Sequence, residues 1–425
     1  MKQVPYWLDT STPGPDRSQT PVPVSVDVAV VGSGLTGLTA AIGLARKGRS
    51  VAVFEKDTVG SGASGRNGGG CTSGMSIGFL KAVTRYGLPT ASKLYLMYND
   101  AIDAVEKLVA DEGIDCDFAR TGKLNLASKP SHYDALKRTH QALADRMGYE
   151  TTLVPRDNIR SEIGSDYYHG GLTDPLGAVL HVGKFVRGLG EVASEAGVQL
   201  LERTPVTGLE RLSGATHQVR TSRGEVKAGQ VLIATDGYTG SAVPRLQRRI
   251  VPVGSFVVVT EPLERELVDQ LMPTRRMASD SLNLLYYFRI TPDNRMLFGG
   301  RARFAMSNPQ SDLKSGRILQ KAMVKVFPQL AGRRIDYTWG GQVGMTLDQV
   351  PHAGTSNGVF YSLGYNGHGV QMATYMGQQM AEVMDGHPEA NPWGDFAFKA
   401  VPGHFGPPWF LPLAGAYYRL QDIIK

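Results

Sequence analysis

The residues best placed to do chemistry are three glycines and one acid near the start of the chain. Gly32, Gly34 and Gly37 form a Gly-x-Gly-x-x-Gly turn between an apolar strand and an apolar helix, and a second strand ends at Glu55. The first glycine of such a turn makes the bend, the second admits a pyrophosphate, and the third lets the helix pack on the sheet. The helix N-terminus adds unpaired N–H groups and a positive dipole. Since a carboxylate at Glu55 accepts hydrogen bonds from ribose hydroxyls, the unit predicts dinucleotide binding.

Three later features favour FAD over NAD. A glycine-rich loop, residues 61–69, follows Glu55 directly, and Ala234-Thr-Asp-Gly-Tyr follows a strand near mid-chain. Near the C-terminus, Gly367-His368-Gly369 lies at a strand-to-helix turn, where a helix N-terminus can stabilise negative charge on a reduced flavin. An NAD(P)-dependent dehydrogenase is the alternative, and these later elements argue against it.

Composition narrows the class of protein further. The 425 residues allow two domains, and the charged residues give a net charge of +6 without a long basic run. We therefore expect no nucleic-acid partner, although the positive charge leaves open a flavoprotein that acts on a macromolecule such as tRNA. The two cysteines fit neither a disulfide framework nor a metal site. No apolar leader or stretch of about 20 apolar residues is present, so we expect a cytoplasmic protein with no membrane span.

The order of the patterns predicts an α/β fold with two interleaved domains. Hairpin strands are expected at 218–221 and 225–228, strands at 255–260, 284–290, 295–299 and 359–363, and helices at 131–147, 314–327 and from 369 to about 384. We assign residues 1–95, 160–240 and 336–390 to a discontinuous Rossmann-type domain that binds the dinucleotide. Residues 96–159 and 241–335 then form a smaller substrate domain with an antiparallel or mixed sheet, and 391–425 form a docked C-terminal segment.

Several motifs together resemble one family. They are Gly-Ser-Gly-Leu-Thr-Gly at 32–37, Gly-Ala-Ser-Gly-Arg-Asn-Gly-Gly at 62–69, Tyr-Tyr-Phe-Arg-Ile-Thr-Pro-Asp at 286–293, Trp-Gly-Gly at 339–341 and Tyr-Asn-Gly-His-Gly-Val at 365–370. The chain resembles the D-amino-acid oxidase-type FAD-dependent oxidoreductases, which include sarcosine and glycine oxidases, and is most similar to their γ-glutamylputrescine oxidoreductase branch. The resemblance covers the whole chain and implies a glutathione-reductase-like FAD fold.

The resemblance also implies a set of FAD-binding residues. The pyrophosphate would be held by Gly32, Ser33, Gly34, Leu35, Thr36 and Gly37, the ribose by Glu55 and Lys56, and the adenine by the backbone of Val206. The flavin would contact Ala63, Ser64, Arg66, Asn67, Gly68, Thr235, Gly237, Gly344, Met345, Gly367, His368 and Gly369. Several relatives attach the flavin through a cysteine near residues 340–346, and no cysteine lies there. We therefore expect non-covalent FAD.

The implied activity is oxidation of the C–N bond of a small amine, by hydride transfer from the carbon beside nitrogen to flavin N5 and hydrolysis of the imine. Oxygen or another acceptor would take the electrons. The candidate catalytic residues are His368, Tyr287, Arg289, Arg301 and Tyr365. The arginines either bind an acidic substrate group or form ion pairs, and the tyrosines either line the substrate site or pack in the core. Sarcosine-like N-methyl amino acids and D-amino acids are the alternative substrates.

Overall fold

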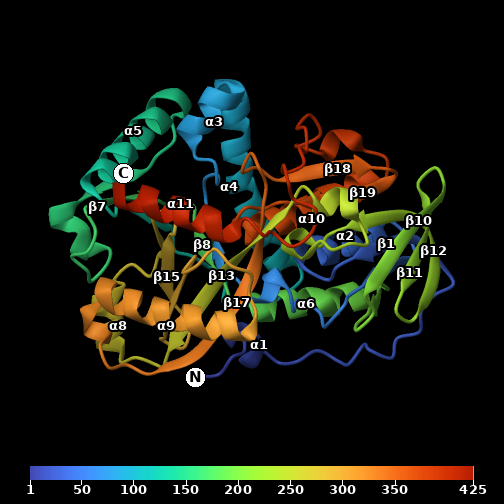
Figure 1. Cartoon of the computed structure of the whole chain (residues 1–425), viewed down its shortest axis with the longest axis horizontal. Helices are drawn as coiled ribbons and strands as arrows, with labels where there is room; N and C mark the ends of the chain where they lie inside the picture. Colours follow the sequence, from blue (N-terminus) through green and yellow to red (C-terminus); the bar gives the residue numbers. More distant parts are fainter. Residues whose placement is uncertain (425) are drawn as a thin grey trace.

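The fold is built on two large sheets. The computed structural model describes residues 1–424 and contains two eight-stranded sheets and one three-stranded sheet. In Figure 1 the first sheet, with β1, β10, β11 and β12, lies at the right, and the second sheet, with β13, β15 and β17, lies at the left. The α/β fold class expected from the sequence is confirmed.

The first sheet contains the predicted Rossmann unit. Its strands are β1 (Ser25–Val31), β2 (Val51–Phe54), β9 (Gln199–Leu201), β10 (Val206–Ser213), β11 (Thr216–Thr221), β12 (Gly224–Ile233), β18 (His352–Ser356) and β19 (Val359–Leu363). Strand β1 lies between β2 and β12 and is parallel to both, while β11 and β12 form the predicted antiparallel hairpin. The carboxyl ends of β1, β2 and β12 therefore meet at one edge of this sheet.

The turn after β1 requires its glycines. Gly32 has φ +104°, a conformation that residues with a Cβ rarely adopt. A Cβ added to Gly37 would lie 1.9 Å from the carbonyl oxygen of Gly32. Helix α2 (Leu35–Arg46) can thus begin directly against the turn, as the sequence predicts.

The second sheet has the strand order β17-β13-β16-β15-β14-β5-β7-β6. These strands are β5 (Lys123–Leu126), β6 (Thr152–Pro155), β7 (Gly170–Asp174), β13 (Val251–Thr260), β14 (Met277–Asp280), β15 (Tyr286–Ile290), β16 (Met296–Gly300) and β17 (Ile335–Met345). One face, with Leu124, Phe256, Phe288 and Phe298, joins the apolar cluster that also contains Leu319 of α9 (Pro309–Val326). The opposite face is turned toward the first sheet, because Val257 and Trp339 belong to the cluster that contains α2.

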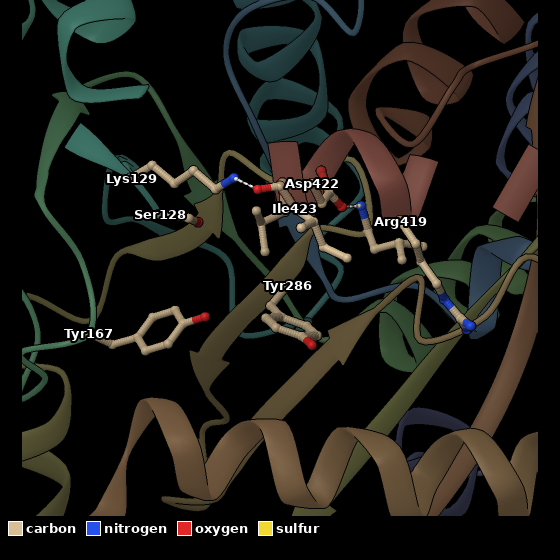
Figure 2. Close-up of a pocket in the computed structure, with 9 residues that line it drawn as sticks. Ser128, Lys129, Tyr167, Tyr286, Arg419, Asp422 and Ile423 are labelled. Atoms are coloured by element: carbon tan, nitrogen blue, oxygen red, sulfur yellow. Dashed lines mark hydrogen bonds between the residues drawn. The ribbon is translucent and has the colours of Figure 1, made fainter. Parts of the chain in front are cut away.

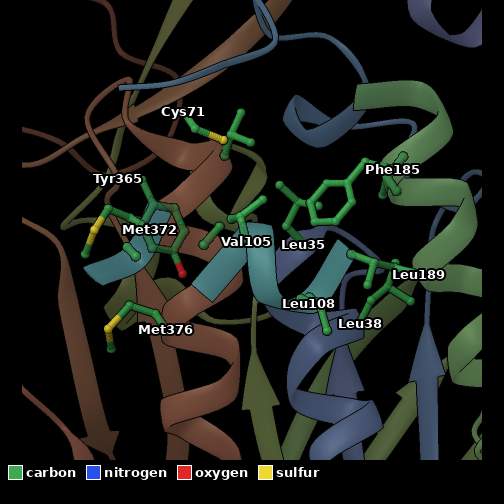
Figure 3. Packing of buried hydrophobic residues seen from close by; sticks show 14 of the residues in the cluster. Leu35, Leu38, Cys71, Val105, Leu108, Phe185, Leu189, Tyr365, Met372 and Met376 are labelled. Carbon is green, nitrogen blue, oxygen red and sulfur yellow. The ribbon is translucent and has the colours of Figure 1, made fainter. Parts of the chain in front are cut away.

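Helices between the two sheets form the main core. Helix α2, α4 (Leu88–Asp111), α6 (Val182–Glu195) and α10 (Gly369–Met384) contribute Leu35, Val105, Phe185 and Met376, among others, to this cluster. Figure 3 shows these side chains together with Cys71, whose thiol lies inside the core. Burial raises the pKa of that thiol, so Cys71 is a packing residue.

The remaining elements are short or peripheral. They are α1 (Tyr6–Asp9), α3 (Phe79–Tyr86), α5 (Pro130–Met147), α7 (Pro244–Gln247), α8 (Arg265–Leu271), α11 (Leu411–Ile424), β3 (Gly70–Cys71), β4 (Ala119–Arg120), β8 (Ala178–Val179) and the 3₁₀ turns η1 (Ala63–Gly65), η2 (Arg156–Ser161), η3 (Asp236–Tyr238), η4 (Pro328–Leu330) and η5 (Pro388–Ala390). Within residues 1–424, no helix is long and apolar enough to cross a membrane.

Helix α11 was not predicted, and it docks on the second sheet. Asp422 accepts hydrogen bonds from the backbone N–H groups of Asn283 (2.9 Å) and Leu284 (3.0 Å), and Tyr418 stacks on Phe304. Figure 2 shows Asp422 and Ile423 above a hollow of about 330 Å³ that Tyr167 and Tyr286 also line. The other side of the helix, with Leu413, Tyr417 and Leu420, is exposed.

The strand assignments change two of the expected domain boundaries. Strand β7, within 160–240, and strand β17, within 336–390, both belong to the second sheet rather than the first. Sequence alone could not place them, because strand pairing is decided by partners far away in the chain. We propose that residues 170–174 and 335–345 be assigned to the substrate domain and the other boundaries kept.

Candidate active site

A long cavity of about 850 Å³ opens at the carboxyl ends of β1, β2 and β12. Nine of the predicted cofactor residues line it: Gly32, Gly34, Glu55, Lys56, Ala63, Ser64, Arg66, Val206 and Thr235. It extends to Tyr238, the last residue of the Ala234-Thr-Asp-Gly-Tyr motif, and to Asp312 and Gln342, for which the sequence gave no signal. The volume is in the range of cofactor sites, and its position follows the rule for open α/β sheets.

Residues at the glycine turn connect β2, α2 and the loop that follows. Glu55 Oε2 accepts hydrogen bonds from the Ser33 N–H (3.0 Å) and the Ser33 hydroxyl (2.8 Å). The N–H of Leu35, in the first turn of α2, donates to Ser64 Oγ at 3.0 Å. The three segments are therefore held around the N-terminus of α2, where an anion is most favoured.

The loop 61–69 is fixed by its own polar side chains. Arg66 donates to the carbonyls of Ser61 (2.7 Å) and Gly340 (3.0 Å), which joins the loop to β17. Asn67 donates to the carbonyls of Ala63 and Ser64 and accepts from the Gly69 N–H. The expected flavin-facing residues Arg66 and Asn67 thus shape the loop, and the cavity lining includes the first of them.

Asp236 is a buried organiser that the sequence analysis missed. Its carboxylate accepts from the N–H of Gly364 (2.7 Å) and of Gly344 (3.2 Å), and so joins β17 to the end of β19. Its backbone has φ +39°, which a non-glycine residue seldom adopts. The Thr-Asp-Gly sequence at the end of the strand is a signal for a binding site. The resemblance implies flavin contacts for its neighbours Thr235 and Gly237 and none for Asp236.

His368 is the N-cap residue of α10 and has an unpaired ring nitrogen. Its Nδ1 is buried without a hydrogen-bond partner in the described structure, and its ring meets Tyr98 edge-on at 5.4 Å. Burial, with the nearby charges of Lys123 and Arg301, lowers the pKa of His368 to about 3. The imidazole is therefore neutral at physiological pH and available as a donor or acceptor.

Gln371, one turn into α10, has a similar free atom. Its Nε2 donates to the Thr72 carbonyl at 2.7 Å, and its Oε1 is buried without a partner. Because native buried polar atoms are normally paired, the free atoms of His368 and Gln371 indicate where a bound group approaches α10.

Two of the five candidate catalytic residues are committed to structure. Arg289 donates to the carbonyls of Gly69, Leu180 and Ile290, and it is almost fully buried. The Tyr365 hydroxyl shares hydrogen bonds with Thr36 (2.6 Å) and Ser362 (2.9 Å) inside the core. Of the two roles that the sequence left open for Arg289 and Tyr365, these contacts favour the structural one.

Tyr287 and Arg301 keep accessible surface on the inner face of the second sheet. The Tyr287 hydroxyl lies 3.3 Å from Ser255 Oγ, and its ring packs against Gly68 and Gly299. The Arg301 guanidinium makes only long contacts, to the Asn283 carbonyl (3.4 Å) and to the Met345 sulfur (3.9 Å). Burial lowers the pKa of Arg301. Most of its donors are free for a ligand.

The remaining predicted cofactor residues are brought together near these groups. Gly237 packs against the Gly344 backbone, and Gly367 has φ +93° in the turn before α10. A Cβ at Gly34 would meet Ser64 Oγ at 2.8 Å. The long cavity, the crowded glycines and the unpaired atoms at α10 fit a dinucleotide with a ring system at one end, as in FAD.

The class of protein follows from this geometry and from a family match. Residues 27–383 match the family described as FAD dependent oxidoreductase, named DAO. The chain belongs to this family and is an FAD-dependent oxidoreductase that acts on amines or amino acids. The resemblance and the FAD cofactor inferred from the sequence are confirmed.

Individual relatives place it within the family. The chain is 33% identical to gamma-glutamylputrescine oxidoreductase of Escherichia coli K12 over 94% of this chain and 93% of the relative. It is 34% identical to the probable oxidoreductase OrdL of Haemophilus influenzae, over 85% and 84% of the two chains. The crystal structure of glycine oxidase from Geobacillus kaustophilus matches with a TM-score of 0.73 and 21% identity, covering 90% of this chain and 99% of that one, which supports the fold.

Proposed function

We propose that the enzyme oxidises the C–N bond of γ-glutamylputrescine or of a similar small secondary or primary amine. FAD, when bound, supplies the hydride acceptor for the carbon beside nitrogen. The 33% identity to gamma-glutamylputrescine oxidoreductase over nearly the whole of both chains is the observation that carries this proposal. Oxygen or another acceptor then takes the electrons.

The proposed site residues have separate roles. The glycine turn and the N-terminus of α2 would hold the pyrophosphate, with Glu55 near the ribose and Val206 near the adenine. His368 and Gln371 would face the flavin from α10 with their unpaired atoms. Tyr287 and Arg301 would face the substrate, and Arg289 and Tyr365 would position neighbouring segments.

The electrostatics of the site favour the neutral form of an amine. An ammonium has no lone pair to assist loss of hydride, so the site must shift the bound substrate toward its neutral form. Burial and the positive charges of Lys123 and Arg301 depress the pKa of His368. The same surroundings would depress the pKa of an amine bound beside it.

Non-covalent attachment of FAD has a simple test. No cysteine is among the described residues that line the cavity, and none lies at residues 340–346. Denaturation with acid or heat is expected to release intact yellow FAD into the supernatant. Colour that stays with the precipitated chain would contradict non-covalent binding, and a colourless preparation that binds NAD would contradict the whole proposal.

The substrate is tested by mixing the holoenzyme anaerobically with a panel of amines. The panel contains γ-glutamylputrescine, sarcosine, a D-amino acid and a simple alkylamine. We expect γ-glutamylputrescine to bleach the flavin fastest, since flavin reduction reports the chemistry without the final acceptor. Faster reduction by sarcosine or by the D-amino acid would reassign the substrate. Rapid return of colour in air would identify oxygen as an acceptor.

A further inference from the structure

A row of polar side chains lies on the inner face of the second sheet, where apolar residues would be expected. Residues opposite one another in a ladder share a face. Asn125 on β5 pairs with Ser279 on β14, which pairs with Tyr287 on β15. Lys123, two residues before Asn125, points to the same face. We call Lys123, Asn125, Ser279 and Tyr287 the polar row.

Two contacts link the polar row to the cavity. Tyr287 reaches Ser255, and Ser255 pairs with Gly341, the neighbour of the cavity residue Gln342. At its other side the row approaches α10, because the charge of Lys123 acts on His368. The row therefore lies where a substrate would extend away from the cofactor.

The polar row is largely unsatisfied by the protein. Within residues 1–424, Asn125 and Ser279 make no side-chain hydrogen bond. Lys123 makes only one, to the Ser73 carbonyl at 3.1 Å. All three keep some accessible surface although they lie deep between the sheets. A ligand that enters between the sheets can therefore bond these three side chains without displacing protein partners.

Two cations near the polar row lack a direct ion pair. Neither Lys123 nor Arg301 forms an ion pair in the described part of the chain. Asp174, which lies opposite Lys123 in the pairing of β5 with β7, accepts hydrogen bonds from Tyr149 (2.9 Å), Tyr95 (3.4 Å) and the Leu176 N–H (3.0 Å). Asp174 acts on the charge of Lys123 from across the ladder but forms no direct ion pair with it, so an anionic ligand would give Lys123 a direct partner.

We propose that Lys123, with Asn125 and Ser279, binds a carboxylate at the non-reacting end of the amine substrate, and that Arg301 contributes a second positive charge. This inference rests on the proposed function and narrows it to amines that carry an acidic tail. Lys123 supplies a compact charge, while the amide of Asn125 and the hydroxyl of Ser279 supply neutral donors. None of the three was singled out from the sequence, where Lys123 is one of many scattered charges.

The test compares an amine whose tail carries a carboxylate with an amine whose tail has none. Anaerobic stopped-flow reduction with γ-glutamylputrescine and with N-acetylputrescine gives a Kd and a limiting rate for each. In Lys123→Met, the Kd for the acidic amine is expected to rise about 10- to 100-fold, since a charge-assisted contact is lost, while the Kd for N-acetylputrescine changes less than about threefold. Lys123→Arg should recover most of the affinity, and the exposed control Lys81→Met should match the wild type.

Binding of glutarate, an unreactive dicarboxylate, provides a readout that needs no turnover. Glutarate is expected to perturb the flavin spectrum of the wild type and to do so much more weakly in Lys123→Met. Equal increases in Kd for both amines, or slower reoxidation by oxygen with unchanged Kd, would overturn the carboxylate subsite. If no amine reduces the wild-type flavin, the proposed function fails, and glutarate binding still decides whether the subsite exists.

Discussion

The glycine turn at 32–37 and the polar row on the second sheet are built in opposite ways. The turn is one continuous segment, and its hydrogen bonds and close packing are satisfied by residues within a few positions of β1, α2 and β2. The polar row collects residues from β5, β14 and β15, and its polar groups are left unsatisfied. The difference indicates that the protein fixes the cofactor with a rigid backbone and leaves its unpaired side chains for the substrate.

Substitution in the turn should have the largest effect. Gly37→Ala places a Cβ 1.9 Å from the Gly32 carbonyl oxygen, so either α2 or the turn must move. We expect FAD affinity to fall by about 5- to 150-fold, because overpacking of this kind costs about 1–3 kcal/mol and displaces the phosphate site. Fluorescence titration of the apoprotein with FAD measures this. Gly406→Ala, where a Cβ meets open space, is the control, and unchanged FAD affinity in Gly37→Ala would contradict the packing argument.

Asp236 joins β17 of the second sheet to the end of β19 in the first sheet, and its removal tests this junction. Asp236→Ala leaves the N–H groups of Gly344 and Gly364 without a partner. We expect the free energy of unfolding to fall by about 3–5 kcal/mol, since each unpaired buried group costs about 1–3 kcal/mol. Chemical denaturation measures the change, with the exposed Asp395→Ala as the control. A loss no larger than in that control would show that Asp236 does not organise the site.

Asp280, the last residue of β14 in the second sheet, makes the free energy of unfolding depend on pH. Burial raises the pKa of Asp280 to about 7, and in the unfolded chain the group has its usual pKa near 3.8. Between these values the folded state binds more protons, so this group's contribution to stability is full below about pH 4 and falls as pH rises to 7. The decrease is at most about 4 kcal/mol.

Asp280→Asn should remove that decrease and keep the hydrogen bonds that Oδ1 accepts from the Leu282 and Tyr286 N–H groups. Unfolding free energies of both proteins measured from pH 4 to pH 7 give the comparison. Parallel curves for the two proteins would contradict the raised pKa.

The smallest effect concerns the support that α11 gives to Arg301. Asp422 holds Asn283, whose carbonyl accepts from Arg301. In Asp422→Ala we expect the Kd of γ-glutamylputrescine to rise about 2- to 10-fold, with less change for N-acetylputrescine. Asp395→Ala is again the control. Equal changes for both amines would assign α11 to stability alone.

Features formed by one continuous stretch of chain were predicted from the sequence. Features that combine residues from distant strands were not. The turn at Gly32–Gly37, the hairpin of β11 and β12, and the helix after His368 depend on neighbours in the chain, so local patterns were sufficient. Local patterns did not distinguish Arg289 from Arg301. Only strand register and loop packing show that Arg289 donates to three carbonyls, whereas Arg301 makes only long contacts. Lys123 was missed for the same reason, since its neighbours on the sheet, Asp174 and Met277, lie far away in the chain.

One matched pair of substrates decides whether the enzyme oxidises a C–N bond. The holoenzyme is mixed anaerobically with γ-glutamylputrescine and, separately, with the compound in which a hydroxyl replaces the terminal amine. We expect the amine to bleach the flavin and the alcohol to leave it yellow. Bleaching by the alcohol alone, or by neither compound nor any other amine, would contradict oxidation of a C–N bond as the function of this enzyme.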